Sequence, residues 1–167
     1  MGKAEYDFIT WTSFPSSAKI TVEEEAPRGT PWPGEPQAIQ VKAGDKLKVE
    51  VNAKCLNHRP TGDGSISRVT LGGWDGSKWV VMGPYPIIPL PLGTFNWSKF
   101  TSPEVTVPAG ITVVNVGPVG AVGTIWFGDL KIYQDDVLIY ENKFSNWAPV
   151  IIPTEIITGA AMIKFIK

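Results

Sequence analysis

The residues best suited to hold a ligand are aromatic side chains at turns and in loops. Trp74 lies at a hairpin turn, Tyr85 in a proline-rich segment and Trp97 between polar residues, while Trp32 lies in a second proline-rich loop. Turns lie at the protein surface, and an exposed ring offers a flat apolar face on which a ligand can stack. The alternative for each ring is that it fills one end of a hydrophobic core.

Polar side chains next to these aromatics can fix the orientation of a ligand through hydrogen bonds. Asn96 directly precedes Trp97, and Asp75 directly follows Trp74. Because an Asp before a Gly commonly shapes a turn, a structural role is the stronger expectation for Asp75. Asn115 interrupts an apolar strand pattern, which favours a buried amide with its own hydrogen-bond partners.

Asp129 is the candidate metal ligand. The alternation of apolar residues in the segment 123–133 slips by one position at Gly128, which predicts a β-bulge there. A bulge changes where side chains point, and Ca²⁺ binds six to eight oxygen atoms supplied by separate loops. Asp129 is therefore a candidate ligand for a structural calcium ion. The acidic runs 23–25 and 135–136 are typical of solvated surfaces and turns instead.

Little in the sequence indicates catalysis. His58 is the only histidine, and no Gly-x-Ser-x-Gly turn is present. A glycosidase needs only two suitably spaced carboxylates, but no Asp or Glu stands in a context that marks it as catalytic. Cys55 is the single cysteine, which excludes an internal disulfide and a cysteine-rich zinc site. We therefore expect a protein that is not an enzyme.

The composition excludes several other classes of partner. The chain has 167 residues, a net charge of −1 and no basic run, so neither nucleic acid nor a membrane surface is an expected partner. No apolar run is long enough to span a membrane. Residues 1–7 contain no apolar core of a signal peptide, so we expect no secretion signal in this chain as given.

The pattern of the chain predicts an all-β protein. Strand-like segments recur about every ten residues between turn residues, and the chain holds 17 glycines and 15 prolines. Residues 40–54 have the pattern of a hairpin-like pair and residues 56–64 that of a loop. Residues 65–73 and 77–83 have the pattern of two strands joined by a tight turn. We predict an antiparallel β-sandwich.

Two regions are assigned from this pattern. Residues 1–149 are expected to form the sandwich domain. Residues 150–167 form an apolar extension with little charge. Such a segment has to be covered, either by the same domain or by a neighbouring subunit, which makes a homo-oligomer a possible outcome.

Three segments, in order, resemble carbohydrate-binding modules with a galactose-binding-like jelly roll, of the family 4 and family 9 type. They are Val-Lys-Ala-Gly-Asp-Lys-Leu-Lys-Val-Glu-Val at 41–51, the run from Phe95 to Val116 with its Val-Pro-Ala-Gly turn, and Gly-Thr-Ile-Trp-Phe-Gly-Asp-Leu at 123–130. The family commonly has an aspartate where this chain has Gly128, which weakens the transfer of its structural calcium site to Asp129.

The resemblance implies a non-catalytic module that binds a polysaccharide or other glycan through surface aromatic residues. It also implies an extracellular setting, as a module of a secreted protein or as a virion or cell-surface component. An alternative of a different class is a structural or assembly protein with a jelly-roll fold, such as a virion decoration or surface-layer subunit. A third option is a small glycoside hydrolase.

Overall fold

The computed structural model describes residues 2–9, 16–24, 26–31 and 38–144, together with the backbone of residues 150–151. The strands are β1 (Lys3–Asp7), β2 (Ser17–Val22), β3 (Thr30–Pro31), β4 (Ile39–Gln40), β5 (Lys46–Arg59), β6 (Arg68–Trp74), β7 (Trp79–Val81), β8 (Ile88–Pro89), β9 (Gly93–Thr101), β10 (Val105–Thr106), β11 (Val113–Gly120), β12 (Val122–Gln134), β13 (Val137–Asn142) and β14 (Val150–Ile151). No helix in the described part of the chain is long and apolar enough to cross a membrane.

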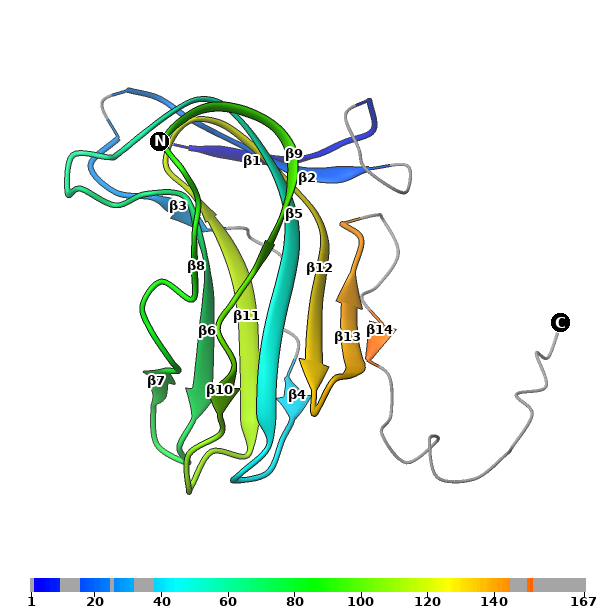
Figure 1. Cartoon of the computed structure of the whole chain (residues 1–167). Helices are drawn as coiled ribbons and strands as arrows, with labels where there is room; N and C mark the ends of the chain where they lie inside the picture. The colour runs from blue at the N-terminus through cyan, green and yellow to red at the C-terminus, as the bar shows by residue number, and fades with distance from the viewer. Residues whose placement is uncertain (1, 10–15, 25, 32–37, 145–149, 152–167) are drawn as a thin grey trace, which may run out of the picture.

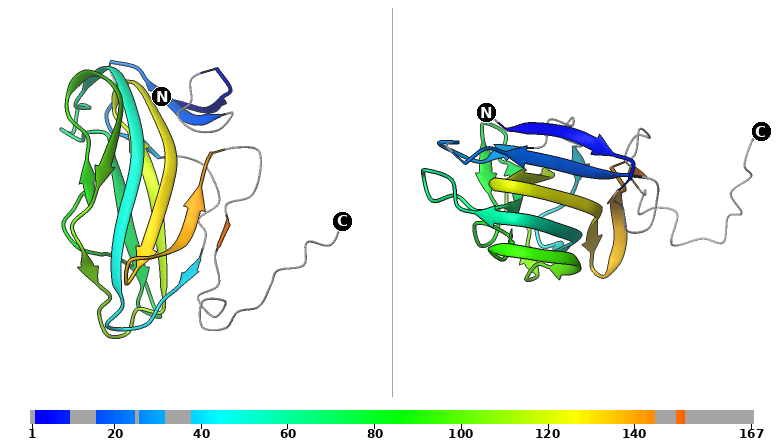
Figure 2. Two further views of the ribbon diagram at one scale, coloured as in Figure 1. Left: turned by 45° about the vertical axis from the view of Figure 1, so that its right-hand side comes forward. Right: turned by 90° about the horizontal axis from the view of Figure 1, so that it is seen from above.

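The strands form two antiparallel sheets, which confirms the predicted β-sandwich. Sheet A has eight strands: β1, β2, β12, β13 and β14 in order, with β5 beside β12 and both β9 and β10 beside β5. Sheet B has six strands: β3, β11, β6 and β7 in order, with β4 on β11 and β8 on β6. Figure 1 shows the long strands β5 and β12 running the height of the molecule, with β1 and β2 crossing at one end. Seen from that end, β1, β2, β12, β5 and β9 lie side by side (Figure 2).

Alternation explains how the core forms between the sheets. In β5 the apolar positions Leu47, Val49 and Val51 are buried, while the lysines, the glutamate and the asparagine between them face away from the core. β6 repeats this pattern, because Val69 and Leu71 are buried and their neighbours are half-buried on the other face. The predicted half-buried strands therefore pack their apolar faces against each other, as a two-layer sandwich requires.

The predicted bulge at Gly128 is confirmed. The pairing of β12 with β5 shifts register between Gly128 and Lys131, and Asp129 has a positive φ of 49°. The extra residue moves the apolar side of β12 from Ile125 and Phe127 to the positions after the bulge. All of these apolar side chains consequently point into the same core despite the slip in the sequence pattern.

Two details of the strand assignment were wrong. The predicted loop at 56–64 begins as strand, because β5 continues to Arg59. The predicted pair within 40–54 is not a hairpin, since β4 pairs with β11 in sheet B while β5 belongs to sheet A. A short turn therefore carries the chain from one sheet to the other, which local sequence patterns do not reveal.

Candidate ligand-binding face

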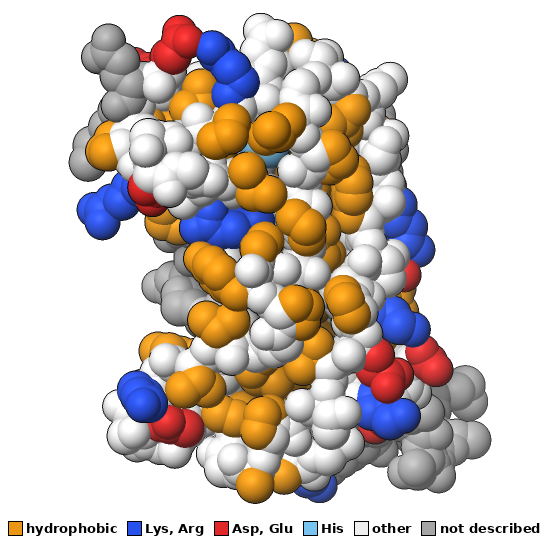
Figure 3. Space-filling model, turned by 60° about the vertical axis from the view of Figure 1, so that its left-hand side comes forward, with side chains coloured by type: hydrophobic (Ala, Val, Ile, Leu, Met, Phe, Trp, Pro, Cys, Tyr) orange, Lys and Arg blue, Asp and Glu red, His pale blue; other side chains and the backbone are white. Residues whose placement is uncertain are grey.

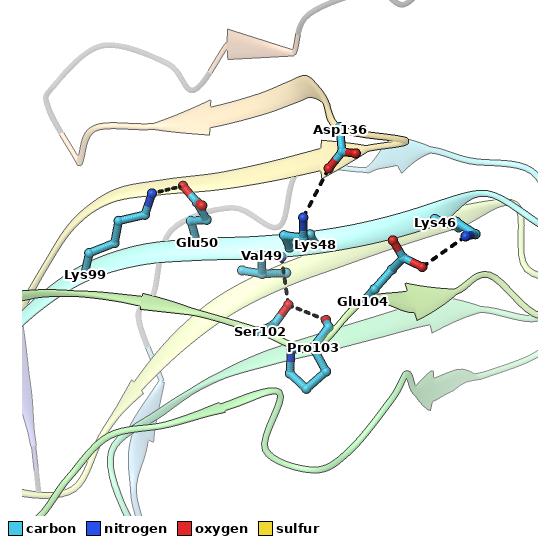
Figure 4. A network of polar contacts seen from close by, with 9 residues as sticks. All are labelled: Lys46, Lys48, Val49, Glu50, Lys99, Ser102, Pro103, Glu104 and Asp136. Carbon is cyan, nitrogen blue, oxygen red and sulfur yellow. Dashed lines mark hydrogen bonds and ion pairs between the residues drawn. The ribbon is translucent and has the colours of Figure 1, made fainter.

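The two outer faces of the sandwich differ in kind, and this difference selects the candidate site. The outer face of sheet A carries many paired charges together with two tryptophans, the half-buried Trp97 of β9 and Trp126 of β12, whose ring centroid lies 5.3 Å from Lys54 Nζ. Lys99 Nζ lies 2.8 Å from Glu50, Lys48 Nζ lies 3.1 Å from Asp136, and Lys46 Nζ lies 3.3 Å from Glu104, so that lysines and carboxylates offset each other (Figure 4). The outer face of sheet B carries aromatic and small polar residues, with Arg68 as the one ionisable residue on its described strands.

The outward positions of β6 and β11 form the centre of the sheet B surface. On β6 they are Arg68, Thr70, Gly72 and Trp74, which alternate with buried residues. In the register between the strands, Thr70 is opposite Gly117, Gly72 opposite Asn115, and Trp74 opposite Val113. We call this surface, together with Trp79 and Val81 of β7 and the neighbouring Tyr85, the β6–β11 face.

A pair of tryptophans marks one end of this face. Trp74 and Trp79 are cross-strand partners, and their ring centroids are 5.7 Å apart with planes inclined by 59°. Trp79 is 51% exposed, and Val81 on the same strand is also exposed. Exposed paired rings of this kind provide a stacking surface for a flat apolar ligand face.

Two glycines form a low floor between the tryptophan pair and the Arg68 end of the face. A Cβ atom added at Gly117 would meet nothing within 4 Å, and one added at Gly72 would lie in ordinary contact, 3.7 Å from the Trp79 ring. The half-buried Asn115 lies opposite Gly72, and its amide forms no hydrogen bond with the rest of the described chain. Thr70 donates its hydroxyl hydrogen to the Gly117 carbonyl oxygen at 3.2 Å. The floor therefore combines open space with polar groups.

Arg68 and Tyr85 mark the other end. The Arg68 guanidinium carbon lies 5.5 Å from the centroid of the Tyr85 ring, and Tyr85 is 59% exposed. Six residues separate Arg68 from Trp74 along β6, so the face is about 20 Å long at ~3.3 Å per strand residue. Apolar side chains gather in a band down the side of the molecule that carries β7 and β8 (Figure 3).

The structure distributes the predicted site residues over both sheets. Trp74 and Tyr85 belong to the β6–β11 face, and Asp75 lies in the turn beside it. Trp97 and Asn96 lie on β9 in sheet A, and Trp32 falls outside the described residues. Trp79 was missed, although the predicted hairpin placed it in reach of Trp74 across the turn.

Asp75 acts as a turn former. Its Oδ1 accepts hydrogen bonds from the backbone N–H groups of Lys78 and Ser77 and from the Ser77 hydroxyl, at 2.8 to 2.9 Å. These bonds, led by the one from Lys78, lower the pKa of the Asp75 carboxyl. Asn96 is likewise engaged, since its side-chain oxygen accepts the Trp97 N–H at 2.9 Å. These bonds hold Asp75 Oδ1 and the Asn96 side-chain oxygen in local turn structure.

The surroundings of Asp129 fit a calcium ion poorly. Asp129 is largely buried, and its Oδ2 accepts a hydrogen bond from Asn52 at 3.0 Å. The small hollow of about 70 Å³ beside it is lined by the basic Lys99 and Lys131 as well as by Glu50. Among the residues that the structure describes, no group of three or more His, Cys, Asp or Glu side chains is arranged to hold a metal. Calcium at Asp129 stays an untested prediction.

His58 is a structural residue within this fold. It is fully buried, its Nδ1 lies 2.6 Å from the Pro91 carbonyl oxygen, and its Nε2 accepts the Ser67 N–H at 2.9 Å. This arrangement requires the neutral ring with its hydrogen on Nδ1. Burial lowers the pKa of His58, which also favours the neutral ring. The ring thus joins the end of β5 to the start of β6 and to the segment before β9.

Two shallow hollows lie away from the β6–β11 face. They have volumes of about 390 and 310 Å³ and share Asn57 and Arg59 at the end of β5. Among the described residues, no Phe, Tyr or Trp side chain lines either hollow. They lack the stacking surface that distinguishes the β6–β11 face.

Comparison with known proteins supports the fold. No family model matches the chain, and no curated protein matches its sequence. The CBM22-1–GH10 modules of endo-1,4-beta-D-xylanase 10B from Clostridium thermocellum, solved with xylohexaose, share the fold with a TM-score of 0.52 and 8% identity, over 80% of this chain and 25% of that chain. The CBM22-1 xylan-binding domain from Paenibacillus barcinonensis Xyn10C has a TM-score of 0.48 and 13% identity, over 80% of this chain and 81% of that chain. The CBM22-2 domain of the same protein has a TM-score of 0.49 and 14% identity, over 78% and 86%.

At these identities the neighbours bear on the fold alone. The family 4 and family 9 type that the sequence resembles is not confirmed. The broader resemblance, to a carbohydrate-binding module with a jelly-roll sandwich, is confirmed at the level of the fold. The chain is an antiparallel β-sandwich with the jelly-roll fold of carbohydrate-binding modules.

Proposed function

We propose that the chain binds a polysaccharide or other glycan across the β6–β11 face and catalyses no reaction on it. The observation that carries this proposal is the pair of half-buried Trp74 and exposed Trp79 at one end of the open floor formed by Gly72 and Gly117. Sugar rings have flat faces of C–H groups that stack on aromatic rings, and their edges carry hydroxyl groups that need hydrogen-bond partners.

The polar groups of the floor match those edges. The Asn115 amide has both a donor and an acceptor without a partner among the described residues, and the Thr70 hydroxyl oxygen can accept a further hydrogen bond. The tryptophans would then supply most of the binding energy, while Asn115 and Thr70 select the orientation of the sugar. A face about 20 Å long, at ~3.3 Å per strand residue, accommodates several consecutive sugar rings.

Xylan is the first ligand to test. The structural neighbours are described as xylan-binding domains, and the xylanase modules were solved with xylohexaose. We also propose an extracellular setting for this chain, as its resemblance to carbohydrate-binding modules implies. The alternative of a structural or assembly protein gains no specific observation from the described residues, and neither does a hydrolase.

The magnitude of stacking can be worked out for Trp79. An aromatic side chain has up to about 250 Å² of surface, so covering the exposed half removes about 100 Å² from water, worth on the order of 2.5 kcal/mol at ~25 cal/mol/Å². Trp79→Ala should therefore weaken binding at least ~10-fold, because each ~1.4 kcal/mol is a factor of ten.

Isothermal titration calorimetry with xylo-oligosaccharides and with a panel of soluble polysaccharides tests this proposal. Trp97→Ala, which removes a half-buried tryptophan from β9 of sheet A, is the matched control and should change the affinity little. Equal losses in the two variants, or a loss confined to Trp97→Ala, would move the site to sheet A. No binding to any glycan in the panel would reject the function.

A further inference from the structure

Arg68 has an unusual environment for a surface arginine. Its Nη1 donates a hydrogen bond to the Ile66 carbonyl oxygen at 2.9 Å, but its Nε is shielded from solvent and has no hydrogen-bond partner. A buried donor without a partner costs about 1–3 kcal/mol, so such groups in native proteins call for an explanation. Among the buried side-chain nitrogen and oxygen atoms of the described residues, the Arg68 Nε alone is left in this state.

The charge of Arg68 is also unmatched. No other outward side chain on the described strands of sheet B is ionisable, and Arg68 forms no ion pair with another described residue. Most lysines of sheet A, by contrast, lie within reach of a carboxylate. The face therefore presents one positive charge within a neutral aromatic and amide surface.

The Asp63 carboxylate interacts electrostatically with Arg68, but it already accepts hydrogen bonds from its own turn. The Thr61 hydroxyl and the Ser65 N–H donate hydrogen bonds to its Oδ1 at 2.6 and 2.9 Å. These bonds lower the pKa of Asp63 to about 2, and Arg68 is the smallest of the contributing causes. Asp63 is thus held in its own turn and does not neutralise the guanidinium.

The geometry of Arg68 suits a carboxylate from outside the chain. With Nη1 bonded to Ile66, the Nε and Nη2 hydrogens remain as a parallel pair on one edge of the guanidinium. Because Nε is shielded from solvent in this structure, a ligand reaches the pair only when a neighbouring side chain such as the exposed Tyr85 ring moves aside. A carboxylate accepts such a pair through both of its oxygen atoms, which makes this a strong and directional contact. The Tyr85 ring lies against the guanidinium and, being exposed, can turn onto the ring of an arriving sugar.

We propose that the Arg68 end of the β6–β11 face is a subsite for a sugar carboxylate, so that the chain prefers glycans bearing uronic acids. This inference rests on the proposed function and adds the class of substrate. The neutral part of the glycan stacks at Trp74 and Trp79, while the acidic sugar pairs with Arg68 through Nε and Nη2 and lies beneath Tyr85. About 20 Å, at ~3.3 Å per residue of β6, separate the two ends, so the acidic sugar is several rings away from the stacked one.

The test compares a uronic-acid-substituted xylan with the same xylan after chemical reduction of its carboxyl groups to alcohols. Titration calorimetry of the full chain should give at least a 10-fold preference for the acidic form at 20 mM salt. The preference should shrink at 500 mM salt, because the ion pair is screened. Arg68→Gln should bring the ratio of the two affinities close to one. Lys46→Gln, which removes a lysine of sheet A, should leave that ratio as it is in the unaltered chain.

Each outcome decides something. Equal binding of acidic and reduced xylan by the unaltered chain overturns the carboxylate subsite and leaves glycan binding standing. A preference that persists in Arg68→Gln shows that another cation recognises the acid, and also overturns it. Failure to bind either xylan or any other glycan rejects the proposed function and the subsite together. Should Arg68→Gln fail to fold, Arg68→Lys keeps the charge without the paired donors and should still reduce the preference several-fold.

Discussion

Filling the open floor of the β6–β11 face should separate binding from stability. A Cβ atom added at Gly117 would have no atom within 4 Å, and φ of Gly117 lies outside the positive range that only glycine adopts readily. Gly117→Val therefore introduces a side chain into empty space above a strand. Because glycine costs about 0.5–1 kcal/mol in a strand and valine favours strands, the free energy of unfolding should stay constant or rise by about that amount.

Binding should fall in the same variant. The valine would lift a ligand from the floor by more than ~1 Å, and a gap of that size forfeits roughly half of the contact energy. If Trp74 and Trp79 together contribute about 5 kcal/mol at ~25 cal/mol/Å², the loss is about 2.5 kcal/mol, or roughly 50-fold in Kd at ~1.4 kcal/mol per factor of ten. Thr101→Ile adds apolar bulk at an exposed position of β9 in sheet A and should leave the affinity unchanged.

The assay is calorimetric titration with xylohexaose alongside urea unfolding of each variant. The expected result for Gly117→Val is an unchanged or higher unfolding free energy with an affinity reduced about 50-fold, as worked above from contact loss. Unchanged affinity would refute the assignment of this face. Weaker binding accompanied by a lower unfolding free energy would mean that the valine disturbs the fold, contrary to the open space seen above Gly117.

Two further predictions concern the fold that holds the face in place. His58 is neutral in the folded chain, and burial lowers its pKa, so the unfolded chain binds a proton more readily. The free energy of unfolding should therefore be constant above pH 6.5, the ordinary pKa of histidine, and should decline as the pH falls below that value. Urea unfolding at pH 7.5 and 5.5 checks this, and an unchanged value, or the same decline in His58→Gln, would contradict it. Gly123→Ala should destabilise the fold by more than about 1 kcal/mol, because φ there is +114° and a Cβ would lie 2.7 Å from the carbonyl oxygens of Leu56 and Asn57. Thermal unfolding measures this effect, and a wild-type Tm would count against it.

Local patterns in the sequence predicted much of the fold. The alternation in β5 and the tight turn after Trp74 follow from two-residue periodicity and turn chemistry, which depend on neighbouring residues alone. The bulge at Gly128 could also be predicted, because a slip in the alternation of apolar residues has few other causes. These features are local, and local physics suffices to predict them.

The site could be predicted only in part, because it depends on which sheet each strand joins. Trp74 and Trp97 are both expected at the surface from the sequence, yet the first lies on sheet B and the second on sheet A. Gly72 pairs with Asn115, which lies more than forty residues away in the sequence, so no local pattern predicts the open floor. Arg68 gives no signal at all, because a missing hydrogen-bond partner is a property of the folded surroundings.

Mapping the bound ligand on the folded chain shows which sheet binds the glycan. Backbone amide shifts should be recorded by NMR while xylohexaose is added to the full chain. The largest changes should fall on β6, β7 and β11, centred on Gly72, Trp79 and Gly117, with β5 and β9 little affected. Changes centred on Trp97 and its neighbours in β9, with β6 and β11 silent, would contradict this prediction.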